Sequence, residues 1–311
     1  MILFSVIIPS YKTTKEVVVR SIDSVLHQSC DDYELIVVDD NDDDEFKKWN
    51  IELKDYYSNI EKVRFVFHEC NKGANYARNT GIKESLGEFV AFLDSDDEWD
   101  YRFLEVVKHN IVCTNKDLFS SNYRLVRKSG ICKPVFSPQK QKSGYIFLNE
   151  IFEDLLGPTS TVCVRKSAII DSGLFDVRLP ARQDYDMWLR ICKSHECVFI
   201  FEPLVKFYKD GHESISSSSQ RYIKGTIMVL DKILKDRDVP NGLHRKIKAA
   251  HYKQIAHACI TTGDYNICRE YIKLSFKNNA SWGIICWYFL SYFPTFFSYL
   301  KMLKEKRDTI S

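Results

Sequence analysis

The feature of this sequence that most constrains its fold is a short apolar run that ends abruptly in carboxylates. Residues 88–93 are almost entirely β-branched, aromatic or aliphatic, and Asp94, Asp96 and Asp97 follow directly. So short an apolar run predicts a buried strand, and carboxylates crowded at its end repel one another unless a cation lies between them. Because Mg²⁺ and Mn²⁺ prefer carboxylate and phosphate oxygens, the pattern favours a metal–diphosphate site; a solvated acidic turn is the alternative.

The first hundred residues alternate between strand and helix patterns. Strands are predicted at residues 3–9, 33–40, 63–67 and 88–93, with helices between them, including one over 73–85. Such alternation predicts an α/β fold with a mostly parallel central sheet and helices on both faces. Ligands bind beyond the carboxyl ends of such strands. Three strands end there in polar clusters, which begin at Pro9, Asp39 and Asp94.

The remaining residues divide into two parts. Between 100 and 215 we expect mixed elements, namely strands near 117–126, 161–164, 198–201 and 204–208 and a helix over 184–192. Beyond 219 the apolar spacing is helical, over 223–234, 243–262 and 265–277. A run of four serines at 216–219 is the best junction. The sequence thus predicts a first domain over 1–219 and a helical region over 220–311.

The charge is distributed unevenly along the chain. The net formal charge of +2 combines −7 over residues 1–219 with +9 over residues 220–311. An acidic main body argues against nucleic acid as a partner, because a basic face would then dominate the fold. A basic tail instead fits attraction to an anionic membrane surface.

The end of the chain is apolar and aromatic. Residues 282–300 hold nine aromatic residues in 19 positions, no charged residue occurs over 278–300, and four basic residues follow by position 307. As a helix, these 19 residues would measure about 28 Å, close to a bilayer core, but Pro294 interrupts them and Trp and Tyr prefer the headgroup level. We expect residues 278–307 to lie in the membrane interface; a packed helical core or oligomer contact, and a true span, are the alternatives.

The cell compartment follows from the N-terminus and the cysteines. The first nine residues are apolar but have no basic region and no small-residue cleavage site, so they do not resemble a signal peptide. The ten cysteines are scattered and form no Cys-x-x-Cys pair, which predicts reduced thiols rather than disulfides or zinc ligands. We therefore expect a cytoplasmic protein that is peripheral on the inner face of the membrane.

Six motifs together resemble the family 2 glycosyltransferases, which have the nucleotide-sugar-binding GT-A fold. Their order and spacing match over residues 3–216. The motifs are Ser5–Tyr11, Glu34–Asp40, Asn71–Gly81, Asp94–Asp97, Gly173–Asp176 and Gln183–Trp188.

The resemblance implies a UDP-sugar as the donor. Pro9 and Tyr11 would border the base, Asp40 would accept the uracil N–H, and Arg78 would face the diphosphate at the start of a helix. The alternatives are a rim aromatic for Tyr11, a helix N-cap for Asp40 or its neighbour Asp39, and a surface ion pair for Arg78.

The resemblance also implies a divalent metal, Mn²⁺ or Mg²⁺. Asp94 is expected near the ribose and Asp96 on the metal, with Asp97 as a further metal ligand. His212 resembles a histidine that lies near the metal and diphosphate in the family, although a lone histidine can equally be structural. The metal would stabilise the departing nucleoside diphosphate.

The general base is expected at Asp184. In the family this aspartate usually follows a glutamate at the start of a helix, whereas here it follows Gln183. The change removes a like charge that would raise the pKa of the base. A helix-capping carboxylate is the alternative for Asp184. Gln183, Asp186 and Trp188 are assigned to the acceptor region, with Trp188 as core or sugar platform.

The combined interpretation is an inverting glycosyltransferase. It would move a sugar from a UDP-sugar to a hydroxyl of a glycan or lipid-linked oligosaccharide, in bacterial surface-polysaccharide biosynthesis. Two alternatives stay open at this point: a nucleotidyltransferase that makes nucleotide-sugars, and a non-catalytic scaffold that keeps the fold.

Overall fold

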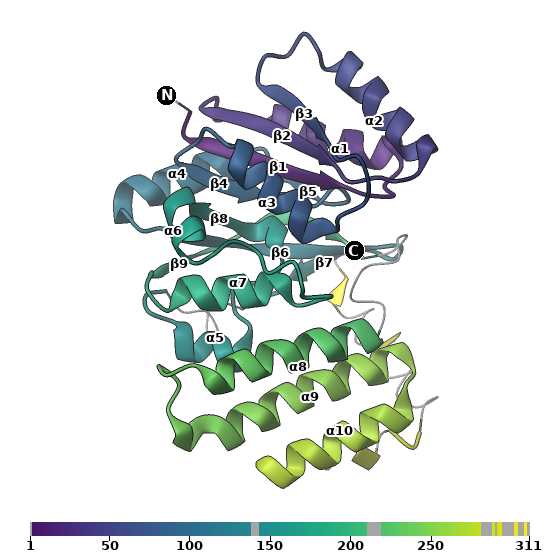
Figure 1. Cartoon of the computed structure of the whole chain (residues 1–311), viewed down its shortest axis with the longest axis vertical. Coiled ribbons are helices and arrows are strands. Elements are labelled where there is room, and N and C mark those ends of the chain that lie inside the picture. Colours follow the sequence, from purple (N-terminus) through teal and green to yellow (C-terminus); the bar gives the residue numbers. More distant parts are fainter. Residues whose placement is uncertain are drawn as a thin grey trace.

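The structure is a computed structural model that describes most of the chain. It covers residues 2–137, 143–209 and 219–280, and near the C-terminus residues 288–289, 291–293, 302–303 and 308–309. All structural statements below refer to these residues. The N-terminal part forms a sheet flanked by helices, and the C-terminal helices stack below it (Figure 1).

The central sheet runs in the order β3-β2-β1-β4-β8-β6-β9-β5, with β7 paired to β6. β1 to β4 are mutually parallel, as are β6 and β9, whereas β8, β7 and β5 pair antiparallel with their neighbours. The strands are β1 (Phe4–Ser10), β2 (Tyr33–Asp39), β3 (Val63–Phe67), β4 (Phe89–Phe92), β5 (Glu98–Trp99), β6 (Leu118–Arg127), β7 (Gly130–Pro134), β8 (Val162–Arg165) and β9 (Cys197–Tyr208).

Helices cover both faces of this sheet, as predicted. Alternate residues of β1 face opposite sides: Val6 and Ile8 pack with α1, α2 and α4, while Ile7 packs with α3, α6 and α7. The helices are α1 (Lys15–Leu26), α2 (Asp44–Tyr56), α3 (Ala74–Glu84), α4 (Phe103–Thr114), α5 (Phe147–Glu153), α6 (Lys166–Asp171), α7 (Gln183–Cys192), α8 (Ser219–Lys235), α9 (His244–Thr262) and α10 (Tyr265–Asn278).

One expectation about the strands was wrong. The sequence predicts two strands at 198–201 and 204–208, but the structure forms the single strand β9 through both. Pro203, which has no N–H to donate, lies where the pairing of β9 with β6 shifts register around Asn122. The irregularity absorbs the missing hydrogen bond, so the strand continues.

The three C-terminal helices lie where the apolar spacing predicts them. α8 and α9 pack against α5 and α7 through a shared apolar cluster that includes Ile151, Leu189, Val229 and Ile247, and α10 packs on α9 (Figure 1). The division at residue 219 therefore stays a prediction about domains, and the helices beyond it share a core with the residues before it.

The aromatic segment 282–300 falls mostly outside the described residues. Of the helices that the structure describes, none has the length and hydropathy that a membrane span needs. Phe289 and Phe293 are described and largely exposed.

Gly81 on α3 allows the close packing of this helix on the centre of the sheet. A Cβ atom at this position would lie 2.5 Å from Cγ2 of Ile7, a fully buried β-branched side chain on β1. In an open helix, Gly→Ala stabilises by roughly 0.5–1 kcal/mol, but overpacking a core costs about 1–3 kcal/mol. We therefore expect Gly81→Ala to destabilise the protein by about 1–2 kcal/mol net.

Urea denaturation measures this change. Gly242→Ala is the matched control, because a Cβ atom there meets nothing within 4 Å. A Gly81→Ala variant as stable as Gly242→Ala would show that α3 does not pack as closely as the structure has it.

Candidate active site

The ends of β1, β2 and β4 lie at one edge of the sheet. Ser10 pairs in register with Asp39, and Leu93, just after β4, donates its backbone N–H to the carbonyl of Ile7 on β1. The polar clusters that follow these three strands are therefore neighbours, as expected for a parallel sheet.

The acidic loop after β4 is held in place by hydroxyl groups near α1. Thr13 and Ser95 share a hydrogen bond of 2.8 Å between their hydroxyl oxygens. Ser21 Oγ on α1 lies 2.8 Å from the carbonyl oxygen of Ser95 and 2.6 Å from that of Asp97. The loop backbone is thus fixed by the protein, independently of any ligand.

Asp97 points into the protein rather than toward a ligand. Its side chain is fully buried and accepts hydrogen bonds from Ser160 Oγ at 2.5 Å and from the backbone N–H of Tyr208 at 3.2 Å. Burial raises its pKa well above the usual range, and the charges of Asp96 and Asp94 raise it further. The assignment of Asp97 to the metal is therefore corrected: both of its oxygens are occupied by protein donors.

Arg78 and Asp94 form an ion pair at the same edge. Arg78 Nη2 lies 2.5 Å from Asp94 Oδ1, and the two side chains are 4% and 27% exposed. Two further donors of Arg78, Nε and Nη1, are buried without a hydrogen-bond partner in the described part of the chain. Because buried donors are almost always satisfied, this pair differs from a surface ion pair and offers N–H groups to an anion.

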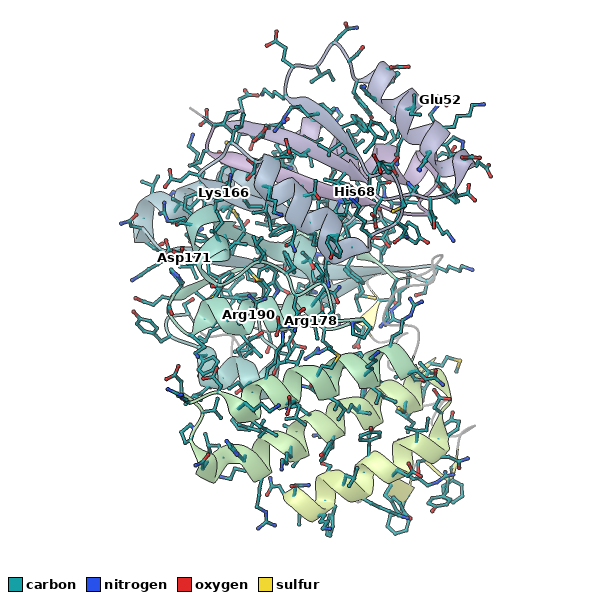
Figure 2. The ribbon with its side chains drawn as sticks, in the orientation of Figure 1. Glu52, His68, Lys166, Asp171, Arg178 and Arg190 are labelled. Carbon is teal, nitrogen blue, oxygen red and sulfur yellow. The ribbon has the colours of Figure 1, made fainter. Side chains whose placement is uncertain are left out.

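Asp40 accepts hydrogen bonds from the backbone of the loop just before α3. Its Oδ1 accepts the backbone N–H of Lys72 at 2.9 Å, and its Oδ2 accepts that of Gly73 at 2.7 Å. The ring of His68, labelled in Figure 2, lies 2.7 Å from the same carboxylate. The helix N-cap alternative is therefore wrong for Asp40, because Asp43 is the N-cap of α2 and α3 has no side-chain cap. The assignment of Asp40 to the uracil stays a prediction.

The neighbouring Asp39 keeps an acceptor without a partner. Its Oδ1 accepts hydrogen bonds from the backbone and side chain of Asn41, at 3.0 and 2.5 Å. Its Oδ2 is buried and makes no hydrogen bond of good geometry within the described residues. Burial raises the pKa of the carboxyl, whereas the nearby Asn41 and Asn50 lower it. The acceptor that the sequence analysis placed on Asp40 is thus available on Asp39.

Pro9 and Tyr11 lie beside this acceptor. Pro9 is buried near the end of β1, and Tyr11 follows the strand with 41% of its surface exposed. Lys12 Nζ lies 5.4 Å from the centre of the Tyr11 ring. An exposed aromatic face beside a strand end suits stacking on a flat base, so Tyr11 keeps the assignment that the sequence predicts.

Asp184 is in the first turn of α7 and is partly exposed. Its Oδ1 accepts the backbone N–H of Tyr185 at 2.8 Å, but the N-cap position of α7 is Arg182, and this helix has no side-chain cap. Burial raises its pKa, whereas the charges of Arg182 and Arg78 lower it and that of Asp154 raises it. A carboxylate with a raised pKa is suited to accept a proton.

Two side chains connect Asp184 with the acidic loop. Arg78, which pairs with Asp94, also lowers the pKa of Asp184 through its charge. Burial raises the pKa of Tyr123 on β6, and both Asp97 and Asp184 raise it further. Carboxylates almost ninety residues apart in the chain therefore act on the same two groups.

Of the three residues assigned to the acceptor region, the structure corrects Asp186 and confirms the core alternative for Trp188. Asp186 is buried, and its oxygens pair with Arg190 at 2.9 Å (Figure 2) and with Lys232 of α8 at 2.7 Å. Trp188 is fully buried and packs against the ring of Phe175. Both stabilise α7, which is buried on almost all sides after Asp184. Gln183 is partly exposed at the start of the helix and keeps its assignment.

The acidic loop fits a divalent cation. Mg²⁺ is commonly held by one or two carboxylates together with substrate phosphates. Asp94 and Asp96 are both partly exposed, and together they raise the pKa of the buried Asp97, as expected where negative charge accumulates. Among the residues described, no group of three or more His, Cys, Asp or Glu is placed to hold a metal, and His212 lies outside them.

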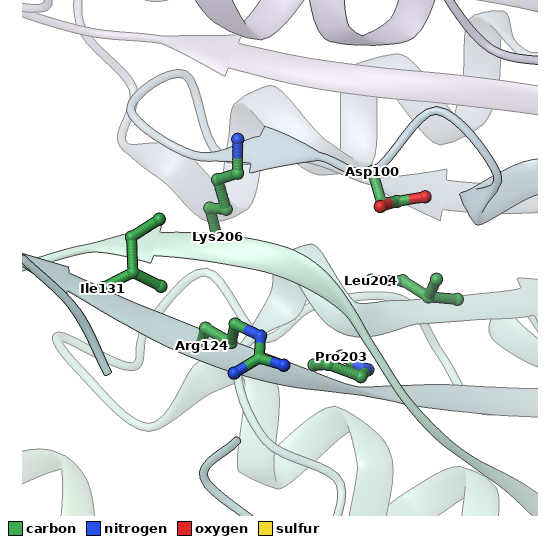
Figure 3. Close-up of a pocket in the computed structure, with 6 residues that line it drawn as sticks. All are labelled: Asp100, Arg124, Ile131, Pro203, Leu204 and Lys206. Atoms are coloured by element: carbon green, nitrogen blue, oxygen red, sulfur yellow. The ribbon is translucent and has the colours of Figure 1, made fainter. Parts of the chain in front are cut away.

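A separate pocket of about 420 Å³ lies between β9, β6 and the loop after β5 (Figure 3). It contains none of the predicted site residues. Its lining residues are Asp100, Arg124, Ile131, Pro203, Leu204 and Lys206.

Two arginines at the site were not singled out by the sequence analysis. Arg20 donates to the carbonyl oxygen of Asp96 at 2.6 Å and stacks 3.6 Å from the ring centre of Tyr208. Arg182, two positions before the predicted base, pairs with Asp154 at 2.6 Å. Neither has a local sequence signal, because the partners of each are far away in the chain.

Comparison with known proteins supports the resemblance to the family 2 glycosyltransferases. A family profile described as Glycosyl transferase family 2 matches residues 5–172. The chain is 30% identical over 227 residues, covering 71% of it and 83% of the relative, to the Escherichia coli enzyme WfgD, named UDP-Glc:alpha-D-GlcNAc-diphosphoundecaprenol beta-1,3-glucosyltransferase. It is 27% identical over 215 residues, covering 67% of it and 70% of the relative, to the Erwinia amylovora amylovoran biosynthesis glycosyltransferase AmsB.

Solved structures share the fold. The chain superposes on S. aureus TarS 1–349 in complex with UDP-GlcNAc with a TM-score of 0.68, at 20% identity, covering 88% of this chain and 81% of that one. It superposes on the Pyrobaculum calidifontis mannosyltransferase PcManGT, in complex with GDP-Man and Mn²⁺, with a TM-score of 0.60, at 15% identity, covering 91% and 77%. The GT-A fold is thereby confirmed, and with the matched family profile and relatives it follows that this chain belongs to glycosyl transferase family 2.

Proposed function

We propose that this glycosyltransferase moves a sugar from a UDP-sugar to a hydroxyl of a lipid-linked glycan, with inversion at the anomeric carbon. The proposal rests on the contacts of Arg78 and on its buried donors. Arg78 pairs with Asp94, influences Asp184 and holds two buried donors without partners. A diphosphate between the acidic loop and α7 would satisfy those donors.

The uridine would be read at the end of β2. Asp39 offers a buried acceptor without a partner, suited to the imide N–H of uracil, and Tyr11 offers an exposed ring for stacking. The UDP-GlcNAc complex of TarS, a protein with the same fold, supports this choice of donor.

The reaction needs one displacement. Asp184 takes the proton of the acceptor hydroxyl while its oxygen bonds to the anomeric carbon, and the bond from that carbon to the diphosphate oxygen breaks, releasing UDP. Arg78 orients the diphosphate through its free donors. A divalent cation held by Asp96, with Asp94 nearby, would neutralise the charge that builds on the departing UDP.

The acceptor and the location are proposed from a relative and from the tail. WfgD is named for an acceptor carried on a diphosphoundecaprenol lipid. The net charge of +9 beyond residue 219 and the aromatic segment 282–300 are suited to an anionic membrane surface. We propose that the protein acts at the inner face of the cell membrane, in surface-polysaccharide biosynthesis.

Family membership favours this proposal over the two alternatives. A nucleotidyltransferase belongs to another reaction class, and the relatives named above are glycosyltransferases. A scaffold that only kept the fold would have no need of buried, unpaired donors on Arg78.

Asp184→Asn tests the base. Because a positioned general base contributes about 10²–10⁴-fold, we expect transfer to fall by about that factor while UDP binding is unchanged. UDP release measures the first and calorimetry the second. Asp171→Asn, at an exposed position on α6 (Figure 2), is the control and keeps wild-type rates. Wild-type transfer by Asp184→Asn would remove this residue from the role.

Asp96→Ala tests the cation. We expect Mn²⁺ to raise the melting temperature in the presence of UDP in the wild type, because ligands that bind the native state stabilise it. The Mn²⁺-dependent part of this increase disappears in Asp96→Ala, while a weaker effect of UDP alone stays. An equal Mn²⁺ effect in both proteins would place the cation elsewhere.

Removal of residues 281–311 tests the membrane surface. The truncated protein keeps α8, α9 and α10. We expect the full chain, and not the truncated one, to float with vesicles that contain anionic lipid, with binding that weakens as salt increases. Equal flotation of both proteins would contradict a membrane role of the tail.

A further inference from the structure

The residue just before α7 has an unusual backbone. Arg182, two positions before Asp184, has a φ of 64°, in the left-handed region that few residues other than glycine adopt. Such strain persists only where the surroundings enforce it, and it concentrates at functional sites. The contacts that enforce it here can be named.

The side chain of Arg182 is held on three sides. Nη1 lies 2.6 Å from Oδ2 of Asp154, which ends α5 and itself has a φ of 51°. The guanidinium stacks over the ring of Tyr185 at 4.0 Å and lies 5.6 Å from that of Tyr222 on α8. Nη2 donates to Gln254 on α9 at 3.4 Å. Only 11% of the side chain is exposed.

The backbone before Arg182 is held by α8. A Cβ atom on Gly225 would lie 2.4 Å from the carbonyl oxygen of Ala181, so α8 packs directly against this peptide. Tyr222 and Gly225 are three residues apart and therefore share one face of α8. Any larger residue at 225 must push the chain that carries Arg182 and Asp184.

Further contacts connect α7 with the same two helices. Lys232 on α8 bridges Asp176 and Asp186, at 2.8 and 2.7 Å. His251 on α9 lies 3.2 Å from the hydroxyl of Tyr185. The start of α7 is therefore fixed by residues beyond 219, which the family motifs do not reach.

We propose that Arg182 is a positioning residue for Asp184, and that α8, through Gly225, fixes the strained backbone that presents this carboxylate to the acceptor. The proposal rests on the proposed function, in which Asp184 is the base. The C-terminal helices then belong to the catalytic unit, whatever the tail beyond them binds.

If Arg182 positions Asp184, its charge also affects the pKa of this carboxylate, so the pH dependence of activity distinguishes the proposal from a packing role alone. The charged groups whose fields act on its pKa are Arg182 on its own loop, Arg78 on α3 and Asp154 after α5, and Asp184 in turn raises the pKa of Tyr123 on β6 and Tyr222 on α8. Arg182 favours the charged form of Asp184 and Asp154 disfavours it.

Removing the charge of Arg182 and removing that of Asp154 are expected to shift the pH profile in opposite directions. Because the base works only when deprotonated, activity falls as the pH drops through its pKa. Arg182→Gln raises that pKa, so the acidic limb of kcat/KM moves to higher pH. Asp154→Asn lowers it, so the limb moves to lower pH. Arg182→Lys keeps the charge and restores a profile near that of the wild type.

Gly225→Ala tests the backbone. Since a displacement of about 1 Å at a reacting group can cost around 100-fold, we expect kcat to fall by about 10- to 100-fold with KM for the UDP-sugar unchanged. Gly242→Ala is again the control. Circular dichroism verifies folding; if Gly225→Ala does not fold, the soluble Arg182 and Asp154 variants decide.

The outcomes separate this inference from the proposed function. The positioning role is overturned if the acidic limbs of the Arg182→Gln and Asp154→Asn profiles shift in the same direction or not at all, and Gly225→Ala keeps the wild-type kcat. In that case an inactive Asp184→Asn variant still supports Asp184 as the base. Full activity of Asp184→Asn instead overturns the proposed function itself.

Discussion

The arrangement of the site depends on the ion pair that Arg78 forms with the acidic loop at the carboxyl edge of the sheet. Arg78 is almost fully buried, yet within the described residues its Nη2 pairs with Asp94 while its Nε and Nη1 have no partner. Burying an incompletely paired guanidinium costs free energy that an apolar side chain would not. Such a cost is typical of functional sites, where local stability is given up for binding. A diphosphate would complete the set of partners, so the site is arranged before any ligand arrives.

The sequence predicts a uracil-binding acid at the end of β2, but it does not determine whether Asp39 or Asp40 has this role. It predicts an acid at the end of β2, and two adjacent aspartates fill that place. Successive residues at a strand end point in different directions, so only one of them can reach the start of α3. Asp40 accepts the amides of Lys72 and Gly73, more than thirty residues away, which leaves Asp39 with an unsatisfied oxygen. That choice is made by tertiary packing and has no local signal.

The same reasoning explains the other differences. The strands and helices around the site were predicted because their apolar periods are local, and β9 was divided only because Pro203 suggested a break. The sequence leaves Trp188 as either core or sugar platform, and its packing against Phe175 shows that it belongs to the core. Arg182 could not be found at all, because its partners are contributed by α5, α8 and α9, and no spacing in the sequence connects them.

The family profile covers fewer residues than the unit that folds together. The family profile ends at residue 172, before α7 begins. The apolar face of α7, with Tyr185 and Leu189, is covered by Val229 and Leu230 of α8. Without α8 those side chains would meet water, at roughly 1.5–3 kcal/mol for each large apolar residue, and Lys232 would no longer pair with Asp186. α8 thus lies outside the shared motifs, yet its contact with α7 must be kept for Asp184, the proposed base, to stay in place.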